Sequence, residues 1–140
     1  MKTMTRILAF ALLAVMVLSL VACSSYGAIL KNFKNAGYVE VDLEEADDST
    51  AKKLVAETEN GNLSCDVHLL QLEGDLLDYY AIILEFASDE ALTEALDENA
   101  TLKGLITDAQ KTKLVRDNCI LIPLSIIKMD NMIELFNEGK

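Results

Sequence analysis

Tryptophan is absent from this 140-residue chain, and histidine and proline each occur once. A single histidine excludes any zinc site that needs two or more histidine ligands. Basic residues are scarce as well, because 12 Lys and Arg stand against 23 Asp and Glu, for a net charge of −11. Nucleic acid is therefore excluded as a partner, since its phosphates require a basic surface. With six glycines and 51% hydrophobic residues, the chain is neither low-complexity nor disordered, and its length predicts one domain.

The first 22 residues have the pattern of an export signal. Lys2 and Arg6 form a basic start, and residues 7–22 form an apolar run whose single polar residue is Ser19. The run has the length of a signal-peptide core and is shorter than the about 20 apolar residues of a spanning helix. The alternative is an uncleaved signal anchor. Both place the following domain outside the cytoplasm, because the positive end of such a segment stays inside.

The sequence Leu20-Val21-Ala22-Cys23 resembles the lipobox of bacterial lipoproteins. The resemblance implies cleavage between Ala22 and Cys23 and a diacylglyceryl group on the Cys23 sulfur, with acyl chains such as palmitate. Two chains hold a protein stably at a membrane, whereas one holds it only reversibly. We therefore expect a lipoprotein signal peptide at residues 1–22, a short lipidated tether at 23–28 and one extracytoplasmic domain at 29–140. Beyond the lipobox the chain resembles small envelope lipoproteins only in composition, which implies no activity.

Hydrophobic spacing predicts the elements of the domain. Alternation of apolar and polar residues predicts strands at 38–43, 63–72 and 76–86, and a short apolar run predicts a buried strand at 119–124. Helical spacing predicts amphipathic helices at 28–36 and 129–137. Two further helices follow N-cap residues, one near Asp48 and one at Ser88, with a break at residues 99–101.

Without the helices at the two ends, the order of elements is βαββαβ, which is typical of the ferredoxin-like fold. We therefore predict an α+β domain with a four-stranded antiparallel sheet in order 4-1-3-2 and the crossover helices on one face. Pro123 fits the edge position of the fourth strand, because proline cannot donate to a ladder. The N- and C-terminal helices are expected to cover either the second face or the edge strand.

Asp66 and His68 share the polar, outward side of the strand predicted at residues 63–72. An imidazole oriented by an aspartate serves as a base or as a metal ligand. The alternative is two solvated residues, and it is favoured because no motif places a nucleophile and no second histidine exists. We expect no catalytic residue, cofactor or metal, and keep Asp66 and His68 as a possible ligand face.

Two other clusters have a plainer interpretation. The acidic run resembles a calcium loop but departs from the pattern at Ala46, Asp47 and Lys53, so we interpret it as a solvated loop. Its members are Asp42, Glu44, Glu45, Asp47 and Asp48. Met129 and Met132 could bind copper, but their helical spacing with Ile133 and Phe136 is typical of a core.

Cys65 and Cys119 are predicted to be free thiols. In the order 4-1-3-2 their strands lie at opposite edges, three spacings or roughly 14 Å apart. A disulfide needs Cα atoms within about 7 Å.

These observations favour a non-enzymatic lipoprotein, held at the membrane by the lipid on Cys23, that works as a binding or scaffold module. Its sheet face or edge would meet an envelope protein or a small ligand. The first alternative is an accessory or protease-inhibitor-like module of an envelope complex, since some ferredoxin-like domains are inhibitors. The second is a hydrolase that uses paired acidic residues, although no hydrolase motif occurs.

Overall fold

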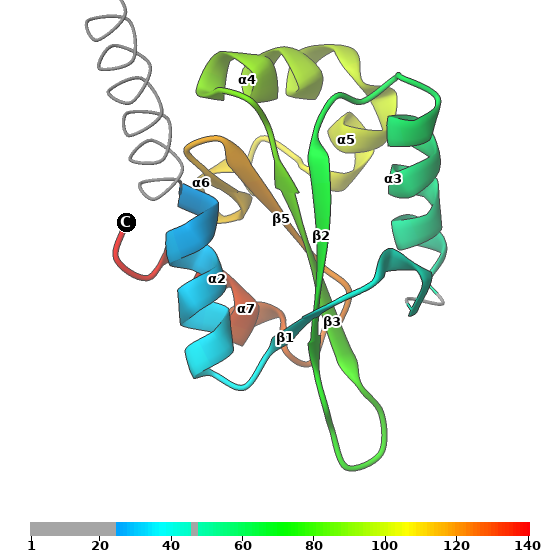
Figure 1. Ribbon diagram of the computed structural model, residues 1–140. Coiled ribbons are helices and arrows are strands. Elements are labelled where there is room, and N and C mark those ends of the chain that lie inside the picture. Colours follow the sequence, from blue (N-terminus) through cyan, green and yellow to red (C-terminus); the bar gives the residue numbers. More distant parts are fainter. Residues whose placement is uncertain (1–24, 46–47) are drawn as a thin grey trace, which may run out of the picture.

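The computed structural model describes residues 25–45 and 48–140 (Figure 1). The signal peptide, Ala22 and Cys23 lie outside the described residues, as does Asp47 of the acidic run. No helix in the described part is long and apolar enough to cross a membrane. The elements are α2 Ser25–Asn35, β1 Val39–Val41, a 3-10 turn Leu43–Glu45, α3 Ser49–Glu59, β2 Asp66–Leu72, β3 Tyr79–Glu85, α4 Asp89–Glu98, α5 Ala100–Leu105, α6 Lys111–Leu114, β4 Val115–Arg116, β5 Cys119–Pro123 and α7 Met129–Asn137.

The domain is α+β, as predicted, with an antiparallel five-stranded open sheet in order β1-β2-β3-β5-β4. The predicted four-stranded order 4-1-3-2 is therefore wrong. In that order β1 would be central, yet β1 has three residues and leaves Val39 52% exposed. The interior strands are β2, β3 and β5. Of these, β3 and β5 carry continuous apolar runs, as suits a strand that is buried on both faces.

Helices cover both faces of the sheet (Figure 1). The terminal helices α2 and α7 pack against each other on one side, and α3 and α5 lie on the other side. Of the two positions expected for the terminal helices, the second face is the observed one. The side chains that they bury are Ile29, Phe33, Met132 and Phe136.

Local signals position the helices. The Asp48 side chain accepts hydrogen bonds from the N–H groups of Thr50 and Ala51 and so caps α3. Ser88 caps the start of α4, and Asn99 ends α4 and caps the start of α5. These bonds satisfy N–H groups that a helix start leaves unpaired. The N-caps and the break were predicted correctly.

Three local predictions need correction. Residues 25–28, expected in the tether, form the first turn of α2, and the Ser25 hydroxyl donates to Asp117. The link between β2 and β3 is not a tight hairpin turn but the longer loop 73–78. The strand β4 was not predicted, because two residues are too few to show an alternation. It pairs with β5 across a turn in which Asp117 has a φ of 52°.

Candidate functional site

His68 lies in a polar cluster beneath α2 rather than on a solvated face. Its ring stacks on Tyr26, with centroids 3.8 Å apart, and 19% of its side chain is exposed. The Nδ1 atom lies 2.9 Å from Glu40 Oε1, and Nε2 lies 3.2 Å from Glu85 Oε1. The predicted outward position of His68 is therefore wrong. The reason is that α2 covers the face of the sheet that the alternation assigned to solvent.

Asp66 is exposed, and the carboxylates that contact His68 are those of Glu40 and Glu85. These two glutamates meet opposite edges of the imidazole, one at each ring nitrogen, so they do not converge on one point. Within the described ranges, no group of three or more His, Cys, Asp or Glu is arranged to hold a metal ion. Each ring nitrogen therefore has a carboxylate oxygen within hydrogen-bond distance. The arrangement is that of a polar cluster whose members are paired with one another.

Tyr26 completes this cluster from the first turn of α2. Its hydroxyl donates to Glu40 Oε1 at 3.0 Å. Burial, and then the negative charge of Glu40, raises the pKa of Tyr26 far above its ordinary value. The phenol therefore stays neutral and remains a donor. Stacking and hydrogen bonding together attach the start of α2 to β1 and β2.

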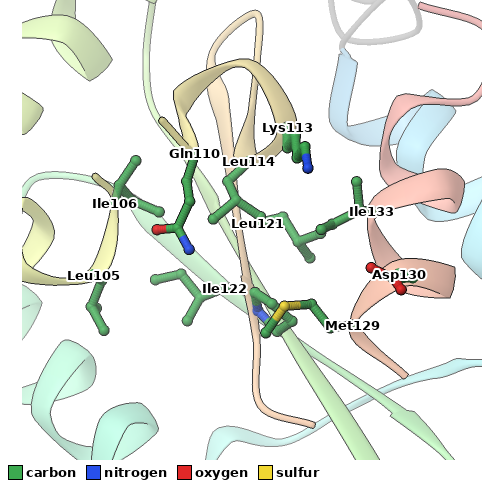
Figure 2. Close-up of a pocket in the computed structure, with 11 residues that line it drawn as sticks. Leu105, Ile106, Gln110, Lys113, Leu114, Leu121, Ile122, Met129, Asp130 and Ile133 are labelled. Carbon is green, nitrogen blue, oxygen red and sulfur yellow. The ribbon is translucent and has the colours of Figure 1, made fainter. Parts of the chain in front are cut away.

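The other candidate is an apolar groove beyond the end of β4, between α5, α6 and α7 (Figure 2). Its volume is about 230 Å³. Its floor is the outer edge of β5, and polar groups of α7 and of the segment around α6 stand at its rim. The lining residues are Leu105, Ile106, Gln110, Lys113, Leu114, Leu121, Ile122, Pro123, Met129, Asp130 and Ile133.

The groove exists because β4 is shorter than β5. Strand β4 pairs only with Cys119 and Ile120. The residues that precede β4 in the chain form α6 and do not continue the strand. The edge of β5 from residue 121 to 123 therefore has no neighbouring strand. Pro123 belongs to an interior strand, which corrects the edge prediction. The N–H of the next residue, Leu124, donates to the carbonyl of Tyr80 in β3. The nitrogen of Pro123 therefore points away from β3, toward the groove, and proline is tolerated because no ladder hydrogen bond is lost.

Sequence reasoning missed this groove, although the sequence analysis singled out three of its lining residues, Pro123, Met129 and Ile133. Met132 is buried in the core as predicted, whereas Met129 lines the groove. The available signal was the apolar edge at residues 119–124 together with Pro123. Two further apolar side chains, Ile126 and Ile127, are 89% and 77% exposed in the loop between β5 and α7, next to the groove.

The thiols of Cys65 and Cys119 are free, as predicted. The reason differs, because their strands are separated only by β3, or about 10 Å. In addition, Cys65 lies on the side of Val67 and Cys119 on the side of Leu121, and these are opposite faces of the sheet. Burial raises the pKa of each thiol to about 12. A thiol in this state is a poor nucleophile at neutral pH.

The two regions thus have different chemistry. In the cluster around His68, the titratable groups are paired with one another, whereas the β5 groove offers a mostly apolar lining. The chain matches no family model, no curated protein and no solved structure.

Proposed function

We propose that this protein is a membrane-anchored extracytoplasmic lipoprotein whose domain works by binding, with an apolar ligand held in the β5 groove. The observation that carries the proposal is the groove, which is lined by apolar side chains from β5, α5 and α7. Ligand sites typically combine an apolar lining with a few polar groups. Gln110, Lys113 and Asp130 are such groups here.

A non-enzymatic role agrees with the state of the reactive groups. The ring nitrogens of His68 are engaged by two carboxylates, and the two described thiols have a raised pKa. A hydrolase that used the β5 groove would need a pair of carboxylates there, and Asp130 is the one carboxylate that lines this groove. The inhibitor alternative depended on the ferredoxin-like strand order, which the sheet does not have.

The anchor part of the proposal is supported by the basic start, the apolar run and the lipobox at residues 20–23. Because Ser25 already belongs to α2, a lipid on Cys23 would lie two positions before a helical residue of the domain. The domain would then lie close to the bilayer. Its net negative charge repels anionic headgroups, so the lipid rather than the protein surface would provide the attachment.

Binding is tested with the apolar fluorescent probe 1-anilinonaphthalene-8-sulfonate. We expect the native protein to enhance its fluorescence, and Met129→Glu to weaken probe binding by about tenfold, because it places a charge in the groove. Glutamate is well tolerated in the first turn of a helix, so α7 should persist. The matched control is Asn131→Glu, an exposed position of the same helix outside the groove. Equal binding by both variants would contradict the assignment of the site.

The anchor is tested separately by the intact mass of protein extracted from membranes. We expect loss of residues 1–22 and addition of a diacylglyceryl group. Cys23→Ala should leave the precursor unprocessed, and an unchanged mature mass in this variant would refute lipidation.

A further inference from the structure

We infer that the end of the sheet where β2 joins β3 is a docking surface for a partner protein whose contact area is apolar and bordered by lysines or arginines. The surface consists of two loops, residues 73–78 between β2 and β3 and residues 124–128 between β5 and α7. It is separate from the lining of the β5 groove, so the inference goes beyond the proposed ligand and does not depend on it.

Tyr79, the first residue of β3, lies between the two loops. Gly74 of the first loop is close to its ring, since a Cβ atom at position 74 would lie 2.9 Å from Tyr79 Cε2. From the second loop, the Lys128 ammonium lies 5.4 Å from the centroid of the same ring. The N–H of Leu124 donates to the carbonyl of Tyr80, the next residue of β3. The two loops therefore lie at the same end of the sheet (Figure 1).

This end carries the exposed apolar side chains of the domain. Leu76 and Leu77 are 99% and 56% exposed in the first loop, and Ile126 and Ile127 are 89% and 77% exposed in the second. Val39, which begins β1 beside the end of β2, is also exposed. These are the large apolar side chains left exposed in residues 25–45 and 48–140. Single exposed apolar residues are ordinary, whereas a concentration of them marks an interaction site. We call the surface of Leu76, Leu77, Ile126 and Ile127 the apolar tip.

The first loop is held in place by its own contacts. The Asp78 carboxylate accepts hydrogen bonds from the Gln71 side chain at 2.7 Å and from the N–H of Gly74 at 3.4 Å. Glycine is required at position 74, because a side chain there would clash with the carbonyl of Leu77. The leucines are thus displayed by a structured loop, which lowers the conformational entropy that binding has to remove.

The charges of the two loops select the chemistry of the partner. The first loop carries Glu73, Asp75 and Asp78, and the second carries Lys128, which lies over the Tyr79 ring. Opposite charges across an interface favour association, and like charges oppose it. A partner with basic residues around an apolar contact area therefore complements the tip. A second copy of this chain or an anionic bilayer would bring negative charge against it.

The position of the tip also favours a protein over the bilayer of the proposed anchor. Ser25, at the start of α2, contacts Asp117 in the turn between β4 and β5, which adjoins the end of β3 opposite Tyr79. The seven residues of β3 span about 20 Å between these two ends (Figure 1). A lipid on Cys23 would therefore leave the tip at the far end of the domain. The lipid is part of the proposed function, whereas the acidic loop is independent of it.

The test uses tryptophan as a reporter, because the chain has none. Leu76→Trp places the reporter in the tip, and Glu94→Trp is the control, on the exposed and acidic side of α4. The purified protein, with phosphatidylcholine vesicles present, is titrated with acetyl-Lys-Leu-Ile-Leu-Lys-amide. A second peptide has glutamates in place of the lysines, and a third has serines in place of the apolar residues.

We expect the first peptide to shift the emission of Leu76→Trp with an affinity about tenfold above that of either other peptide, because only it matches both the charge and the apolar surface. Adding Ile126→Ser to this variant should remove most of the preference over the serine peptide. At Glu94→Trp the two lysine peptides should act alike, since only charge attracts them there.

Three results would overturn the inference. The first is equal affinity of the three peptides at Leu76→Trp. The second is quenching of its emission by brominated phosphatidylcholine, which would place the tip in the bilayer. The third is a change of emission with protein concentration alone, which would show that a second copy covers the tip. The groove has its own test in the fluorescent probe and Met129→Glu, so the two proposals fail or stand separately.

Discussion

The polar cluster around His68 and the β5 groove differ in how the rest of the domain covers them. On the side of β1, the polar ring of His68 is covered by Tyr26 and paired with Glu40 and Glu85. On the side of β5, residues 121 to 123 have no neighbouring strand beyond the end of β4 and line a groove, although Leu121 and Ile122 are themselves buried. A polar group that leaves water must be paired, whereas apolar surface can stay exposed at a cost in free energy. A groove lined by apolar side chains in a small domain is therefore a feature that a ligand can use.

The difference arises from the elements that lie next to each of these two regions. Helix α2 is long enough to bring its first turn over β2 and to bury Ile29 and Phe33 below it. Strand β4 has only two residues, because α6 ends at Leu114, immediately before β4 begins. The His68 cluster is thus covered by the packing of α2, whereas β4 is too short to fill the β5 groove.

The largest expected effect concerns the packing of α2. Phe33 is fully buried, with its ring 5.0 Å from that of Tyr38 in an edge-on arrangement. We expect Phe33→Ala to lower the free energy of unfolding by about 3–5 kcal/mol. Met129→Ala at the groove should cost less than about 1 kcal/mol, because its side chain is partly exposed already. Denaturant unfolding of both variants measures the difference. Equal losses of stability would contradict the view that α2 is tightly packed and that the groove is not.

The second prediction concerns the polar cluster itself. His68→Ala removes the stacking on Tyr26 and leaves Glu40 and Glu85 without their common partner. We expect a loss of about 1–3 kcal/mol, in the range of hydrogen bonds to charged groups. The matched control is Asp66→Ala, two residues away on the same strand but exposed, which should change stability by less than about 0.5 kcal/mol. Equal losses would mean that the cluster does not hold α2.

A separate effect is expected at alkaline pH. The pKa of Cys65 and of Cys119 is raised by burial from an ordinary 9.0 to about 12. Between pH 9 and 12 the unfolded chain loses thiol protons that the folded chain retains, so the free energy of unfolding falls as pH rises. Unfolding of the native protein and of the double variant Cys65→Ala and Cys119→Ala, from pH 8 to about 11, measures the thiol contribution. A decline just as steep in the double variant would show that the thiols do not cause it.

Elements set by neighbours in the chain could be predicted from the sequence. The bounds of α7 agree with the predicted helix at residues 129–137, and α3 and α4 begin after the N-caps that were expected. These signals involve residues two to four positions apart, and such residues are close in space in any fold that keeps the helix or strand. The same holds for the α+β class, which depends on counting helices and strands.

The order of the strands, the surroundings of His68 and the groove depend on contacts between distant residues. His68 and Glu40 are 28 positions apart, and His68 and Glu85 are 17 apart. Alternation along β2 shows that two faces differ, but not that α2 covers the face carrying His68. The groove likewise depends on where β4 stops relative to β5 and on α5 and α7 standing at its two sides. The periodicity of the chain therefore determined the helices and strands, and packing between them decided which polar group is enclosed and where an apolar groove remains.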